Sequence, residues 1–189
     1  MTKKDLLIVI TVAMIIMLIT GTAIIFALDY LGVFDQELNA NKSDPPFTAS
    51  EEVPKIVREI KNLPTEPDIL EDYVLLTVDH ADLVSRIMEE IQLASSGHNA
   101  AAVIDYSELL IDTADVFIKM YDNGELPHEL EAATNNYYQG MIHFQDAARL
   151  IISGFRDGNR EDISRASELL QRGANEIQRS VTKVEQLDI

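Results

Sequence analysis

The sequence predicts an all-α protein in which one N-terminal transmembrane helix precedes an up-down antiparallel four-helix bundle. Three observations lead to this fold class. Residues 6–28 form an uncharged apolar run. After it, apolar residues recur at steps of three and four in long segments, and no alternating strand pattern occurs. Turn-forming residues divide the second half of the chain into four such segments, which suits helices that alternate in direction.

The apolar run at 6–28 is long enough to cross a membrane. At about 1.5 Å per residue it makes a helix of roughly 35 Å, against a hydrocarbon core of about 30 Å. A cleaved secretory signal is the alternative, because Gly21, Thr22 and Ala23 are small residues like those of a cleavage site. Cleavage there would leave the apolar stretch 24–28 as the new N-terminus. We therefore predict an uncleaved signal-anchor.

The charges beside the apolar run predict its orientation. Lys3 and Lys4 precede it, whereas the flank after it is acidic until Lys42. Because basic residues stay on the cytoplasmic side, residues 1–5 are expected to form a cytoplasmic stub. The protein should then be a single-pass protein of the cell membrane whose C-terminal domain lies outside the cytoplasm.

The composition restricts the partners and the chemistry. The chain has 189 residues, a net charge of −17 and no cysteine. Such an acidic chain repels nucleic acid, so no nucleic-acid partner is expected. Without cysteine there are no disulfides, zinc–thiolate sites, iron–sulfur clusters or covalently attached haem. The partners we expect are the membrane itself and another membrane or envelope protein.

Residues 29–66 have the composition of a linker, with four of the six prolines of the chain. Asn41 begins an Asn-Lys-Ser sequon and is a candidate glycosylation site. Within the linker, apolar residues at helical spacing predict a short amphipathic helix at about 51–62. This helix could lie on the membrane surface or pack against the bundle, and the sequence leaves both open.

The acidic bundle is predicted to span residues 67–189. Its helices are expected at about 67–95, 99–122, 127–156 and 160–187. In the connection between the last two predicted helices, Gly158 suits a left-handed position after a helix, and Asn159 suits the cap of the helix that follows. The coiled-coil-like apolar stripes predict the core: Leu70, Tyr73, Thr77, His80, Val84, Ile87, Ile91; Val103, Tyr106, Leu110, Thr113, Phe117, Met120; Leu130, Tyr137, Met141, Phe144, Ala148, Ile151, Phe155; Ile163, Leu170, Ile177, Val181, Val184.

No catalytic signature occurs in the sequence, and we expect no enzyme activity and no cofactor. A di-iron bundle needs two inward-facing Glu-x-x-His motifs. The chain has one match, Glu125 to His128, beside Pro127 in a predicted turn. No metal site is expected.

One level of the predicted core replaces leucine with polar and small residues. Counting outward from each turn brings His80, Thr113 and Tyr137 to similar heights. Glycine inside a helix costs about 1 kcal/mol relative to alanine, so two glycines near the same level require a reason. These residues could line a small ligand-binding cavity, or they could be close-packed core with internal hydrogen bonds. The candidate ligand-binding residues are His80, Thr113, Tyr137, Gly140, His143 and Gly173.

A second candidate is a row of four carboxylates at helical spacing, Asp105, Glu108, Asp112 and Asp115. Such a face could bind calcium or a basic partner, or it could be an ordinary solvated surface.

The sequence therefore predicts a membrane-anchored extracytoplasmic module that binds a protein or a small ligand and performs no catalysis. A structural or accessory subunit of a cell-envelope or membrane complex is the alternative. A metal- or haem-binding bundle is a third.

Overall fold

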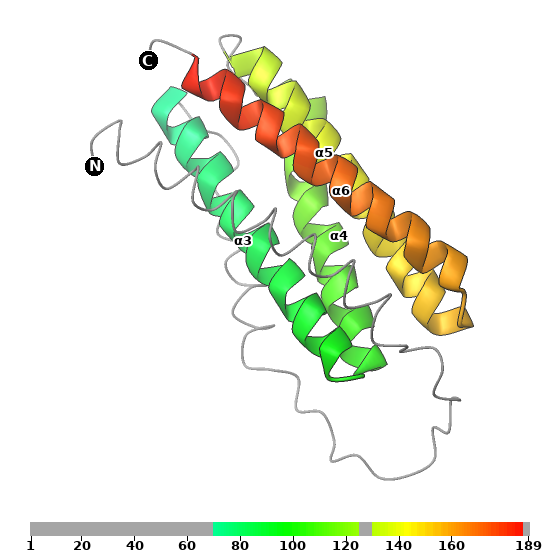
Figure 1. The fold of residues 1–189 in the computed structure, drawn as a ribbon. Helices are drawn as coiled ribbons and strands as arrows, with labels where there is room; N and C mark the ends of the chain where they lie inside the picture. The colour runs from blue at the N-terminus through cyan, green and yellow to red at the C-terminus, as the bar shows by residue number, and fades with distance from the viewer. Residues whose placement is uncertain (1–69, 125–129, 187–189) are drawn as a thin grey trace.

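The computed structural model describes residues 70–124 and 130–186, and this part of the chain is all-helical (Figure 1). The all-α prediction is confirmed for these residues. The predicted anchor at 6–28, the amphipathic helix at 51–62 and Asn41 lie outside them, as does the Glu125–His128 motif. None of the described helices is long and apolar enough to span a membrane. The helices are α3 (Leu70–Ser96), α4 (Ala100–Asp122), α5 (Glu131–Asp157) and α6 (Arg160–Glu185).

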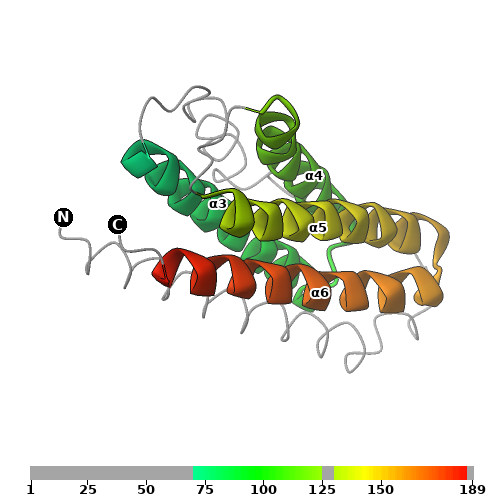
Figure 2. The same cartoon turned by 90° about the horizontal axis from the view of Figure 1, so that it is seen from above.

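Helices that follow one another in sequence run in opposite directions and lie side by side (Figures 1 and 2). The closest packing is between α5 and α6, followed by α4 with α5 and α3 with α4. In Figure 2 the axes of α5 and α6 run nearly parallel, and α3 and α4 cross behind this pair at an angle. Short turns impose this order because each helix must pack on the one before it.

The turn between α5 and α6 follows the sequence prediction. Gly158 has φ 66°, the left-handed conformation that favours glycine because it has no Cβ. The Asn159 side chain then caps α6 by accepting a hydrogen bond from the backbone N–H of Glu161 at 3.0 Å. At the start of α4, Asn99 does the same for Ala102 at 3.1 Å.

The apolar stripes predicted from the sequence form the core. Every predicted stripe residue from His80 to Val181 is buried except Phe155, which is half-buried. Thr77 and Val184, nearer the start of α3 and the end of α6, are also half-buried. The side chains of Leu70 and Tyr73 lie outside the described part. Burial of this set supplies the main stabilisation of the fold, because each buried aliphatic or aromatic side chain contributes roughly 1.5–3 kcal/mol.

Helices α5 and α6 approach closely along a repeat of small residues. A Cβ added to Gly140 would lie 2.8 Å from Cγ1 of Ile177 and 3.1 Å from the carbonyl oxygen of Gly173. A Cβ on Gly173 would lie 2.6 Å from Cε1 of Phe144. We call this repeat the small-residue seam. It recurs every seven residues on both helices and is buried throughout: Ala133, Gly140, Ala147, Gly154; Ala166, Gly173, Ser180.

The seven-residue spacing keeps the seam in register along the whole α5–α6 pair. In antiparallel helices, a step of seven forward on one matches a step of seven backward on the other. Gly140 faces Gly173, and two repeats further on Gly154 faces the backbone of Asn159, whose carbonyl oxygen would be 3.1 Å from an added Cβ. The seam therefore fixes both the separation and the register of α5 and α6.

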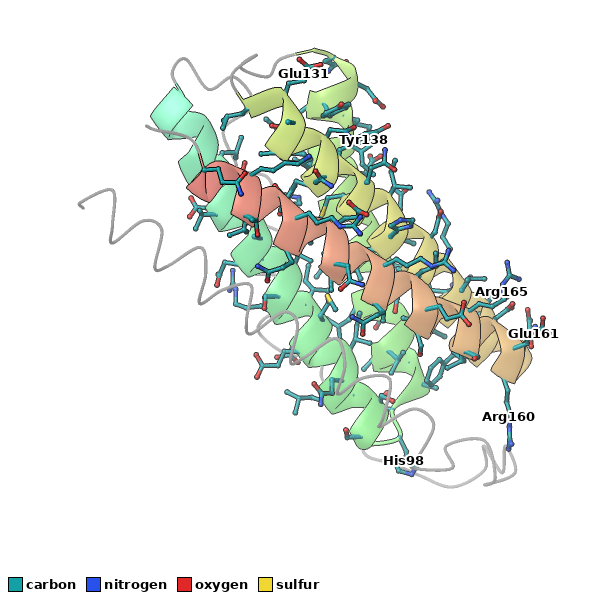
Figure 3. The ribbon with its side chains drawn as sticks, turned by 45° about the horizontal axis from the view of Figure 1, so that its top comes forward. His98, Glu131, Tyr138, Arg160, Glu161 and Arg165 are labelled. Carbon is teal, nitrogen blue, oxygen red and sulfur yellow. The ribbon has the colours of Figure 1, made fainter. Side chains whose placement is uncertain are left out.

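A reciprocal pair of tyrosines joins α4 to the first part of α5. The rings of Tyr121 and Tyr138 stack with centroids 4.1 Å apart. The Tyr121 hydroxyl donates to Asn135 Oδ1, and the Tyr138 hydroxyl donates to Asp122 Oδ1, each at 3.1 Å. Figure 3 shows Tyr138 toward the same end of the molecule as Glu131, near the start of α5. Each tyrosine thus bonds to the opposite helix, and the rings are used in packing α4 against α5.

Candidate functional site: the polar level of the core

His80 lies at the centre of the candidate site and joins three helices. Its Nε2 is 2.7 Å from the backbone carbonyl oxygen of Thr113 on α4, and its Nδ1 is 2.8 Å from the hydroxyl of Tyr137 on α5. The His80 residue is only 1% exposed, and Thr113 and Tyr137 are equally inaccessible. The structure therefore brings together three of the six residues that the sequence singled out.

The partners of the imidazole determine where its proton lies. A carbonyl oxygen can only accept, so Nε2 must carry the hydrogen that it donates to Thr113. In the neutral ring Nδ1 is then an acceptor, and the Tyr137 hydroxyl donates to it. Both ring nitrogens are satisfied by the protein. Neither is left for a ligand or a metal ion.

Burial keeps this imidazole neutral. Desolvation lowers the pKa of His80 from 6.5 to about 4, and the hydrogen bond to the Thr113 carbonyl opposes the shift only in part. A charged imidazolium would have to leave water for an apolar surrounding without a counter-ion. The His80 side chain therefore behaves as a polar core residue at neutral pH.

Aromatic rings enclose the His80 imidazole. The Phe117 ring lies 5.6 Å from it and the Tyr137 ring 5.8 Å, measured between centroids. Phe117 and Tyr137 contact each other edge to face with centroids 4.5 Å apart. Thr113 turns its own hydroxyl back to the Leu109 carbonyl at 2.8 Å, so that group is also satisfied. The result is a compact His–Tyr–Phe cluster.

The other three candidate residues lie apart from this cluster. Gly140 and Gly173 face each other in the small-residue seam, where the side chains of Phe144 and Ile177 fill the space beside them. His143 is half-buried on α5 and is not a partner of His80. The glycines thus permit a close helix crossing.

The four-carboxylate row on α4 is a solvated surface with ion pairs. Asp105, Glu108 and Asp112 are exposed. Glu108 pairs with Arg156 of α5 at 2.9 Å, and Asp115 pairs with Lys119 one turn along α4. Across residues 70–124 and 130–186, no group of three or more His, Asp or Glu side chains is placed to hold a metal ion.

A polar network beside the seam was not predicted from the sequence. Asn136, on α5, is buried and donates to the Glu176 carboxylate of α6. Lys183 of α6 donates to the Asn136 side-chain oxygen and, at 3.0 Å, to the carbonyl of Ala132. Arg179 completes the network by pairing with Glu176. The sequence offered one indication of this network: Asn136 lies between Ala133 and Gly140, two members of the seven-residue repeat that packs against α6.

Comparison of the chain with protein-family models, curated proteins and solved structures gives no match.

Proposed function

We propose that this chain is a non-catalytic protein-interaction module, an up-down four-helix bundle held outside the cytoplasm by a membrane anchor at 6–28. The observation that carries the proposal is the closed hydrogen bonding of His80. Its two nitrogens bond to Thr113 and Tyr137, so the residues best suited to bind a small ligand are used in holding α3, α4 and α5 together.

The packing around the glycines favours an interaction module over a small-ligand receptor. A ligand cavity in a helical bundle needs space between facing helices. At Gly140 and Gly173 the side chains of Ile177 and Phe144 take that space. What remains for recognition is the outer surface, which is strongly acidic overall, with a net charge of −17 for the chain. A basic protein surface is the partner that this charge favours.

A structural or accessory subunit of a membrane or envelope complex is the second candidate. The small-residue seam and the Asn136 network favour it, because they give α5 and α6 one fixed register and a rigid surface.

Thermal melting separates protein interaction from small-ligand binding. The full chain in detergent is melted with and without a panel of metabolites and divalent metal ions. We expect no compound to raise the melting temperature. A His80→Leu/Tyr137→Phe variant should be about as stable as the parent. It replaces both partners of the His80–Tyr137 hydrogen bond by apolar groups, which is nearly neutral. The Thr113 carbonyl also loses His80, but it lies inside α4, where the backbone N–H one turn later can use it. A compound that stabilises the parent and not the variant would show a ligand site and contradict the proposal.

Single-cysteine labelling tests the location. The chain has no cysteine, so one introduced thiol gives an unambiguous signal. Leu93 is 59% exposed on α3 and is the position for a Leu93→Cys variant. A membrane-impermeant maleimide should label it on intact cells, whereas a Thr2→Cys control should react only after lysis. The reverse pattern, or no labelling of either before lysis, would exclude an extracytoplasmic bundle.

A further inference from the structure

The hydrogen bonds of His80 place a proton-sensitive group at the junction of α3 with two other helices. From α4, His80 meets the Thr113 carbonyl and the Phe117 ring. From α5, it meets the hydroxyl and ring of Tyr137. Among the residues that the structure describes, no charged side chain is a cause of its lowered pKa. Among the buried side chains of the described part, His80 is the one that can gain a proton on acidification.

Protonation of His80 would change the donor and acceptor roles at this junction. With hydrogen on both nitrogens, His80 still donates to Thr113, but the Tyr137 hydroxyl must turn its oxygen toward Nδ1 and lose its own acceptor there. A positive charge would then be enclosed by aromatic rings without an anion. Movement of α3 away from α4 and α5 lets water reach the imidazolium.

The remaining helices are joined in ways that do not depend on this group. Helices α5 and α6 meet backbone to backbone at Gly140 and Gly173, and the Asn136 network links them again. Within residues 70–124 and 130–186, α3 packs extensively only against α4. Among the four described helices, opening at α3 therefore disrupts the least packing.

We propose that α3 is an acid-released helix, which separates from α4 and α5 when His80 is protonated while α5 and α6 stay paired. This device is independent of whether the bundle binds a protein or a ligand.

The expected size of the effect follows from the acid–base equilibrium of His80. Its pKa is 6.5 in a solvated chain and about 4 in the closed bundle. Each unit of difference changes an equilibrium tenfold, so acidification from pH 7 to about pH 4.5 should favour the open form by roughly 50-fold.

Hydrogen exchange of the full chain, followed by mass spectrometry and corrected for intrinsic exchange rates, measures this opening helix by helix. Peptides from α3 should lose about 50-fold in protection between pH 7 and pH 4.5, and peptides from α5 and α6 should lose far less. In a His80→Gln variant, which keeps a donor near the Nε2 position and cannot be protonated, the loss at α3 should disappear.

Three results would overturn the proposal. Protection of α3 that persists at pH 4.5 shows that protonation does not open the junction. An equal loss of protection in α3, α5 and α6 shows global unfolding. An unchanged loss in the His80→Gln variant assigns the acid response to carboxylates.

Discussion

At the scale of single residues, the polar level of the core is explained by the hydrogen bonds of His80 with Thr113 and Tyr137. His80 replaces a leucine in an apolar stripe, and its two hydrogen bonds offset the desolvation of the ring. A buried nitrogen without a partner would cost about 1–3 kcal/mol, which is a large part of the stability of a small domain. The Thr113 carbonyl and the Tyr137 hydroxyl are therefore needed wherever histidine occupies this position.

The lowered pKa of His80 predicts a specific dependence of stability on pH. Above pH 6.5 the imidazole is neutral in both the folded and unfolded chains. As the pH falls from 6.5 toward about 4, the unfolded chain binds a proton that the folded chain does not, so the free energy of unfolding decreases. The total loss is on the order of 3 kcal/mol.

The contribution of His80 to the free energy of unfolding is measured by urea unfolding of the parent and of His80→Gln at several pH values between 4 and 7. Carboxylates contribute equally to both chains, so the difference between the two curves isolates His80. The parent should lose stability relative to the variant as the pH falls. Parallel curves would mean that the pKa of His80 is the same in the folded and unfolded chains, as for a solvated imidazole.

The sequence predicted part of this residue-level picture. The helical spacing brought His80, Thr113 and Tyr137 to one height, because heights depend only on rise per residue and turn position. It could not decide between cavity and hydrogen-bonded core, since that depends on side-chain rotamers. Phe117 was predicted as core, but its contact with the imidazole needed three-dimensional coordinates.

At the scale of secondary-structure elements, α5 and α6 form the most closely packed pair. The seven-residue repeat of small residues on both helices allows backbone contact at Gly140 and Gly173. This repeat is visible in the sequence, yet reading only the large apolar residues overlooks it. The turn signals performed better: Gly158 and Asn159 occupy the capping positions predicted for them, because these residues satisfy local backbone requirements.

The seam predicts the effect of adding one methyl group. Alanine normally stabilises a helix relative to glycine by up to about 1 kcal/mol. In Gly140→Ala the new Cβ would lie 3.1 Å from the Gly173 carbonyl oxygen and closer still to Ile177. We expect a net loss of roughly 1–3 kcal/mol from overpacking, measured by urea unfolding.

Gly97→Ala is the matched control for this substitution. An added Cβ at Gly97 would make only ordinary contacts, the nearest at 3.4 Å to the carbonyl oxygen of Leu93. Its stability should change by less than about 0.5 kcal/mol. If Gly140→Ala were as stable as the control, the close approach of α5 and α6 would not be required for the fold.

At the scale of the whole molecule, apolar periodicity predicted the all-helical class and most of the core of the described part, because both follow from the helical repeat. The predicted anchor at 6–28 and linker helix at 51–62 rest on the sequence. Which part of the surface binds a partner depends on the shape and charge of that partner. The spacing of residues in one sequence does not contain this information. Figure 3 shows the charged side chains of Arg160, Glu161 and Arg165 projecting from α6 near the α5–α6 turn.

The most direct test of the structural role of His80 is nitrogen NMR of its imidazole in the ¹⁵N-labelled full chain, with the His80→Gln variant used for assignment. The ring should be neutral at pH 7 with hydrogen on Nε2, should titrate only near pH 4, and should not respond to the metabolite and metal panel. A titration near pH 6.5, or hydrogen on Nδ1, would show that His80 is not held between Thr113 and Tyr137. A shift on adding a compound would show that it belongs to a binding site.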